Sequence, residues 1–225
     1  MIEFAEVSFA YGERRILDGA SLALDAGSLH FLTGRSGAGK TTLLRLAHLG
    51  LAPDAGRVRL FGEDASRLDR RARARLRRRL GLVTQDCALV DHLTVAENIA
   101  LPLRIAGERP EDRARDVAEV AEWVGLADRM ASRPPELSSG ERRRAEVARA
   151  VIAAPDAVIA DEPTGDVDAE AAERILDLFL ELHRSGRTVL VATHDLGLIR
   201  RAQGRAKART LRLEDGRAIR AGAPL

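Results

Sequence analysis

The eight residues from Gly34 to Thr41, GRSGAGKT, restrict the fold of this chain more than any other segment. The glycines at 34, 37 and 39 let the backbone turn tightly and point successive N–H groups inward. Lys40 adds a compact charge suited to β- and γ-phosphates, and Thr41 adds a hydroxyl suited to Mg²⁺. The segment therefore predicts a phosphate-binding loop. The residues that we expect to bind the phosphates are Gly34, Ser36, Gly37, Gly39, Lys40, Thr41 and Thr42.

The lysine in this segment is unusual for the chain. Lysine and arginine together number 36, yet only Lys40 and Lys207 are lysines. A planar and bulkier arginine would not replace Lys40 in such a loop. Because lysine is so rare here, a chance match is a poor explanation for the pattern.

Short apolar runs alternate with helical patterns, which is typical of an α/β fold with a largely parallel sheet. Leu29–Thr33 is a strand that leads into the phosphate loop, and Thr41–Leu49 is the helix that follows it. Further buried strands are predicted at Leu80–Thr84, Ala157–Asp161 and Thr188–Thr193.

A second, antiparallel β portion is predicted beside this sheet. Its strands are expected at Ile2–Phe9, Ser21–Leu24 and Arg57–Phe61, where apolar and polar residues alternate. Thr210–Leu213 and Arg217–Arg220 flank Asp215-Gly216 and predict a terminal hairpin.

The strand signal disappears between positions 85 and 155, where helices are expected at Val95–Leu103, Glu111–Val124 and Gly140–Ala153. We interpret 85–155 as a helical lobe inserted into a nucleotide-binding core formed by 1–84 and 156–225. The whole of 1–225 is then a single domain.

Seven arginines crowd the segment from Arg70 to Arg79. Apolar residues recur there every four positions, which predicts a helix with one apolar seam and a basic outer face. The seam residues are Leu68, Ala72, Leu76 and Leu80. A solvated face is the simpler interpretation, and anionic lipid headgroups are the alternative. We expect no nucleic-acid partner, since the chain has only seven aromatic residues for stacking and a net charge of +2.

Three features favour a cytosolic location. No apolar run approaches the ~20 residues needed to cross a bilayer. The N-terminal residues lack the order of a signal peptide. A single cysteine, Cys87, excludes an internal disulfide.

Two carboxylates, Asp161 and Glu162, end the apolar run that starts at Ala157. The first suits Mg²⁺, and the second lies where it can orient or deprotonate a water that attacks the γ-phosphate. Acidic residues also cap strands before a proline such as Pro163, but the phosphate loop in the same chain favours the catalytic interpretation.

The segment LSSGE, residues 137–141, precedes a predicted helix. Alone it is a helix N-cap with free N–H groups. Together with the two nucleotide motifs it resembles the signature sequence of the ATP-binding-cassette (ABC) ATPases. That resemblance implies a phosphate-loop NTPase fold with a RecA-like parallel core, an antiparallel β portion and an inserted helical lobe. It also implies Mg²⁺-dependent hydrolysis of ATP.

The resemblance extends in the family's order along nearly the whole chain. Tyr11 resembles the aromatic that stacks on adenine, and Gln85 the glutamine between the metal and the helical lobe. Residues 165–168 resemble the D-loop, so Asp168 is expected at the nucleotide. His194 resembles the histidine that faces the γ-phosphate. The implied metal ligands are Thr41, Gln85 and Asp161, and the implied catalytic residues are Glu162, His194 and Gln85.

The resemblance further implies a homodimer in the ATP-bound state, in which two cassettes pack head to tail around two ATP molecules. Ser138 and Gly140 of one subunit would then complete the site of the other. Two residues depart from the family pattern: Ser139 replaces a usual glycine, and Asp166 replaces a frequent asparagine. Either change is expected to slow hydrolysis without abolishing it.

The segments 59–64 and 85–94 resemble most the cell-division cassettes of the family, although Thr84 and Cys87 replace aromatics common in that subgroup. This implies an FtsX-like integral membrane subunit as partner and a peripheral location on the cytoplasmic face of the bacterial inner membrane. The candidate docking residues are Leu89, Val90, Leu93, Ile99, Leu101 and Leu103, some of which must be core. The alternatives are a lipoprotein-releasing or efflux-type cassette and, as a different class, a soluble ABC ATPase without a membrane partner.

Overall fold

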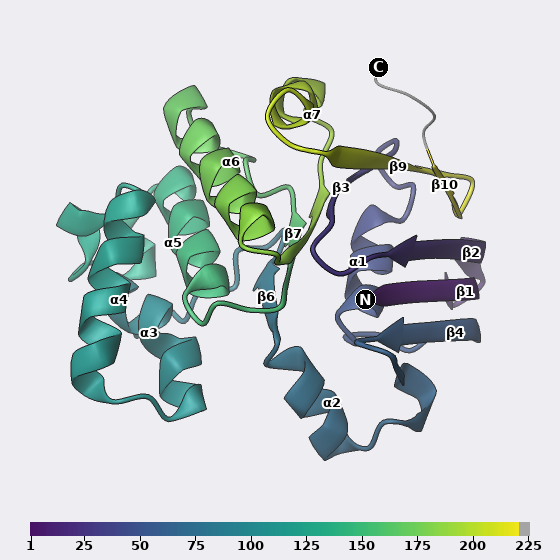
Figure 1. The fold of residues 1–225 in the computed structure, drawn as a ribbon, viewed down its shortest axis with the longest axis horizontal. Coiled ribbons are helices and arrows are strands. Elements are labelled where there is room, and N and C mark those ends of the chain that lie inside the picture. Colours follow the sequence, from purple (N-terminus) through teal and green to yellow (C-terminus); the bar gives the residue numbers. More distant parts are fainter. Residues whose placement is uncertain (221–225) are drawn as a thin grey trace.

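The computed structural model describes residues 1–220, and it contains a mainly parallel six-stranded sheet (Figure 1). The strand order is β10-β9-β3-β8-β7-β6. All neighbours are parallel except β10, which pairs antiparallel with β9. The strands are β3 (Leu29–Thr33), β6 (Leu80–Val83), β7 (Ala157–Asp161), β8 (Thr188–Ala192), β9 (Ala208–Glu214) and β10 (Arg217–Arg220).

Every residue of β7 and β8 is buried, as expected for parallel strands covered on both faces. The bounds of the predicted strands of this sheet agree with the structure to within a residue or two. The predicted terminal hairpin is present as β9 and β10, and β9 also extends the main sheet through its parallel pairing with β3.

A four-stranded antiparallel sheet, in the order β2-β1-β4-β5, lies beside the parallel one. Its strands are β1 (Ile2–Tyr11), β2 (Arg14–Leu24), β4 (Ala55–Leu60) and β5 (Glu63–Asp64). The prediction of Ser21–Leu24 was too short. The strand begins at Arg14, because Tyr11 and Arg14 pair across a tight turn in which Gly12 has φ +58°.

The α-helices are α1 (Lys40–Ala47), α2 (Arg70–Arg77), α3 (Val95–Ala106), α4 (Pro110–Trp123), α5 (Ser139–Val151), α6 (Ala169–Arg184) and α7 (Leu196–Gln203). Single 3-10 turns occupy Ala65–Arg67, Ala127–Arg129 and Pro134–Glu136. Within the described residues, none of the helices has the length and apolar character needed to span a membrane.

The predicted seam of the arginine-rich helix is partly wrong. Leu80 belongs to β6 and Leu68 precedes the helix, so only Ala72 and Leu76 lie within α2, and Leu76 alone is fully buried there. The helix is shorter than the four-residue repeat suggests, because Arg78 and Arg79 lead directly into the buried strand β6.

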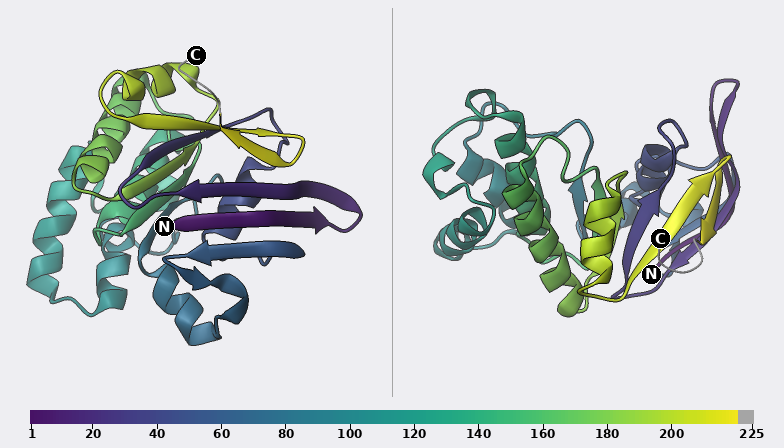
Figure 2. Two further views of the ribbon diagram at one scale, coloured as in Figure 1. Left: turned by 45° about the vertical axis from the view of Figure 1, so that its right-hand side comes forward. Right: turned by 90° about the horizontal axis from the view of Figure 1, so that it is seen from above.

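Helices α3, α4 and α5 lie between β6 and β7 in the sequence, on the side of the parallel sheet away from β1, β2 and β4 (Figure 2). Their buried residues Ile99 and Leu103 belong to the same hydrophobic cluster as Phe31, Val158 and Val189 of the sheet. The helical segment and the sheet therefore share one continuous core. The limits of the lobe at 85 and 155 stay a prediction, and 221–225 of the predicted domain lie outside the described residues.

Candidate functional site

A cavity of about 500 Å³ opens where the phosphate loop, the end of β7 and the segment after β6 meet. Its lining combines backbone and side chains from both sheets: Tyr11, Arg14, Ile16, Gly34, Ser36, Gly37, Gly39, Lys40, Thr41, Thr42, Gln85, Asp161, Glu162 and His194. All the predicted site residues lie here except Ser138, Gly140 and Asp168. Arg14 and Ile16 were not predicted, since nothing in their local sequence marks them.

The phosphate loop depends on its glycines. Gly39 has φ +101°, and a Cβ there would lie 2.8 Å from Cγ2 of Ile16. A Cβ on Gly34 would lie 2.7 Å from the carbonyl oxygen of Leu213. Lys40 Nζ donates to the carbonyl oxygen of Gly34 at 2.9 Å, so the ammonium group is held over the loop. The loop thus directs the N-terminus of α1 and one cation into the cavity, which suits a polyphosphate.

Three oxygen-bearing side chains meet beside the loop. Thr41 Oγ1 donates to Asp161 Oδ2 at 2.7 Å and lies 3.4 Å from Gln85 Oε1. Burial raises the pKa of Asp161, and the hydrogen bond from Thr41 opposes this shift. Hydroxyl, carboxylate and amide oxygens are ligands that Mg²⁺ accepts, so the predicted metal ligands are brought together in a chemically suitable set.

Glu162 lines the cavity, and its backbone is in the left-handed region, with φ +48°. Its Oε2 accepts a hydrogen bond from Thr193 Oγ1 at 3.1 Å, and its Oε1 lies 2.9 Å from Nδ1 of His194. The side chain of His194 is 81% exposed. Glu162 therefore combines a strained backbone with a carboxylate held by Thr193 and His194.

The signature residues lie outside this cavity. Ser138 caps α5: its Oγ accepts from the N–H of Glu141 at 3.2 Å, and its own N–H donates to Glu141 Oε2 at 2.8 Å. That backbone hydrogen bond lowers the pKa of Glu141. Ser138 and Ser139 are exposed, whereas Gly140 is buried. A Cβ on Gly140 would lie 2.9 Å from the carbonyl oxygen of Asp166, so the signature and the predicted D-loop touch.

Asp168 also does not line the cavity. Its carboxylate caps α6 by accepting from the N–H of Ala171 at 2.7 Å, and this bond lowers its pKa. The structure therefore does not bring Ser138, Gly140 or Asp168 to the nucleotide cavity of their own chain.

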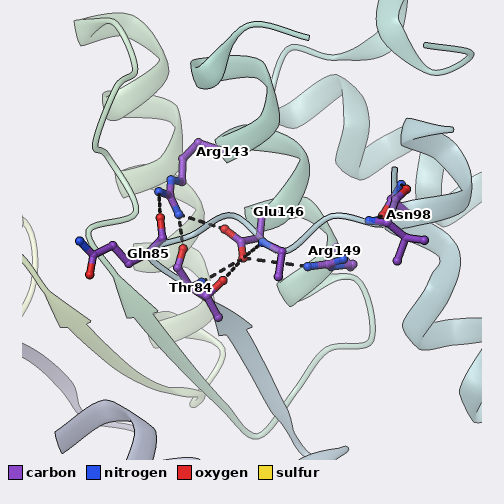
Figure 3. A network of polar contacts seen from close by, with 8 residues as sticks. Thr84, Gln85, Asn98, Arg143, Glu146 and Arg149 are labelled. Atoms are coloured by element: carbon purple, nitrogen blue, oxygen red, sulfur yellow. Dashed lines mark hydrogen bonds and ion pairs between the residues drawn. The ribbon is translucent and has the colours of Figure 1, made fainter. Parts of the chain in front are cut away.

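A buried polar network next to Gln85 was not predicted (Figure 3). Arg143 and Glu146 of α5 and Asn98 of α3 are at most 7% exposed. Asn98 holds the loop before α3 through bonds to Val90 and Leu93. The network could not be recognised from the sequence. Arg143, for example, is the middle one of three consecutive arginines and the only one of them that is buried.

The predicted docking residues divide into two groups. Ile99 and Leu103 are fully buried core. The others are partly exposed: Leu89, Val90, Leu93 and Leu101.

Comparison with known proteins assigns the family. A family model described as ABC transporter matches residues 17–165. The cell division ATP-binding protein FtsE of Escherichia coli (strain K12) is 45% identical over 96% of both chains. The protein of the same name from Haemophilus influenzae is 43% identical over 88% of this chain and 92% of its own.

A solved dimeric ATP-binding cassette in a post-hydrolysis state, bound to ADP and Pi, superposes with a TM-score of 0.89. It is 30% identical and covers 98% of this chain and 97% of its own. The cavity, the motif order and these similarities agree, and the chain belongs to the ABC transporter family as one of its ATP-binding and ATP-hydrolysing subunits.

Proposed function

We propose that this chain is the ATPase of a cell-division complex of the FtsE type and that it acts on an FtsX-like integral membrane subunit. The observation that carries the proposal is the near full-length similarity to two proteins named for cell division, at 45% and 43% identity. Association with the cytoplasmic face of the inner membrane would be peripheral and would occur through the partner.

The cavity that the following residues line supports the roles that we propose for them. Lys40 and the loop N–H groups hold the β- and γ-phosphates, and Tyr11, 46% exposed at the end of β1, offers a ring face to adenine. Thr41, Gln85 and Asp161 would hold Mg²⁺. When bound, the cation offsets negative charge on the phosphates.

Glu162 accepts the proton of the attacking water, and His194 fixes the direction of that carboxylate through the 2.9 Å contact. Asp161 is unsuited to this task because it is already bonded to Thr41.

ATP-bound homodimers would complete each site with Ser138, Gly140 and Asp168 of the opposing subunit. Two observations support this: Ser138 and Asp168 are exposed but lie outside their own cavity, and the similar solved cassettes are dimeric. The exposed N-terminus of α5 offers N–H donors to a phosphate that approaches from another chain.

The docking surface for the membrane subunit consists of Leu89, Val90 and Leu93, which follow Gln85 and are partly exposed. A partner helix would bury them as apolar anchors.

Pull-down from detergent-solubilised membranes tests the membrane partner. We expect Leu93→Glu to fold and bind ATP but to lose an FtsX-like protein, because a single charge in a small apolar contact is enough to break it. Leu196→Glu, at a 44% exposed leucine of α7, is the control and should still recover the partner. Recovery of a lipoprotein-releasing or efflux permease would favour the alternative transporter class, and recovery of no membrane protein by the wild type would favour a soluble ATPase.

A further inference from the structure

An ion pair inside α5 has no part in the chemistry assigned above. Arg143 is 7% exposed and Glu146 is fully buried, and their Nη1 and Oε2 atoms are 3.0 Å apart. Burying two charges is costly even when they are paired, so such a pair calls for a role beyond stability.

The two side chains hold the segment 84–88, which contains Gln85 (Figure 3). Oε1 of Glu146 accepts from Thr84 N at 3.0 Å, from Thr84 Oγ1 at 2.7 Å and from Ala88 N at 3.3 Å. Arg143 donates to the carbonyl oxygen of Thr84 and, at 2.8 Å, to that of Gln85. The segment has no regular secondary structure, and these two side chains give partners to the N–H groups of Thr84 and Ala88 and to the carbonyl oxygens of Thr84 and Gln85.

The network contacts only the backbone of Gln85. Its side chain points away from the network, toward Thr41, with 3.4 Å between Oε1 and Thr41 Oγ1. The network therefore fixes the backbone position of Gln85, and the side-chain amide remains available to act in the cavity.

Helix α5 is itself held firmly at both ends. A Cβ on Gly81 of β6 would lie 2.1 Å from the carbonyl oxygen of Ala150, so the C-terminal half of α5 rests directly on the strand. At the other end, Gly140 touches the backbone of Asp166. Because closely packed backbones move together, α5 connects Ser138 at its N-terminus to the loop of Gln85.

We propose that Arg143 and Glu146 are positioning residues for ATP hydrolysis: they fix Gln85 beside the Thr41–Asp161 pair and join it to the helix that presents Ser138. This rests on the proposed role of Gln85.

Cys87, the chain's single cysteine, is a built-in probe of this segment. The side chain of Cys87 is partly buried while the segment is held, so its thiol should react slowly with iodoacetamide. Release of the segment should expose the thiol and speed the reaction by at least about tenfold.

The test compares Arg143→Lys and Glu146→Gln with wild type. Lysine keeps the charge but cannot reach two carbonyl oxygens and a carboxylate together. We expect folding and ATP affinity to be retained, Cys87 to become reactive, and kcat for ATP to fall on the order of ten- to a hundredfold, as for a misplaced catalytic group. Arg184→Lys and Glu181→Gln are matched controls at an exposed pair with the same spacing, and they should change nothing.

Thr84→Val removes only the hydroxyl bond to Glu146 and serves if the other variants fail to fold. Normal kcat in a variant whose Cys87 has become reactive would overturn the proposal, since the loop would be free and Gln85 still effective. Unchanged labelling in every folded variant would overturn it as well. Gln85→Ala tests the proposed role of Gln85 separately from the roles of Arg143 and Glu146. Wild-type turnover in that variant would refute the role of Gln85 itself.

Discussion

Adjacent carboxylates in this site have different surroundings. Asp161 is 5% exposed and bonded to Thr41, whereas Glu162 contacts Thr193 and His194. Glu162 also takes a positive φ, unlike Asp161. The different surroundings fit the separate roles proposed for the two carboxylates.

Glu162→Gln should bind ATP as wild type does but hydrolyse it about 10²- to 10⁴-fold more slowly, because the amide keeps the shape and loses the base. Phosphate release in the steady state measures the effect, with ATP affinity measured in parallel. Glu170→Gln, which alters an exposed pair with Arg174, is the control. Phosphate release near the wild-type rate would remove Glu162 from its proposed role.

At the scale of elements, α5 begins with a reciprocal cap between Ser138 and Glu141. The lowered pKa of Glu141 means that this carboxylate stays charged below its ordinary titration range. Its contribution to stability is therefore present above the pKa of the unfolded chain and is lost as the pH falls through the lower folded-state value. The proposed ATP-binding serine is thus also a structural cap.

Ser138→Ala should lower the free energy of unfolding by about 1 kcal/mol, the usual cost of an N-cap. Ser138→Asn keeps a capping oxygen and should stay within about 0.5 kcal/mol of wild type, as should Ser139→Ala at an exposed position. Urea unfolding followed by circular dichroism gives these values. Equal stability of Ser138→Ala and Ser138→Asn would show that the cap contributes nothing.

Elements with a local signal were predictable from the sequence, and long-range polar contacts were not. The apolar run Ala157–Ala160 of β7 and the glycine loop before α1 carry their structure in their own residues. The pairing of Tyr11 with Arg14 and the burial of Arg143 depend on distant partners. Thr84 illustrates the difference: its sequence shows only the loss of an aromatic, while the structure shows its hydroxyl bonded to Glu146.

At the scale of the whole molecule, the residues proposed to contact ATP lie on two separate surfaces. Lys40 and Thr41 line the cavity, whereas Ser138 and Asp168 are exposed outside it. A head-to-tail pair of chains would bring the two surfaces together on each nucleotide.

Glu162→Gln with ATP should therefore run as a dimer, because bound and unhydrolysed ATP bridges two chains. Lys40→Ala should stay monomeric, since it loses the cation that holds the phosphates. Size-exclusion chromatography with light scattering distinguishes the two states, and ADP in place of ATP is the control. A dimer that forms equally with ATP, with ADP and without nucleotide would contradict ATP-dependent association.

Because Gly140 contacts the backbone of Asp166, positions 139 and 140 should differ in the substitutions that they tolerate. Ser139 is exposed, so other small or polar side chains fit there without moving the backbone. Any side chain on Gly140 would push two motifs apart at once, one on α5 and one before α6. Among the folded variants of a library randomised in this segment, we therefore expect several residue types at position 139 and only glycine at position 140.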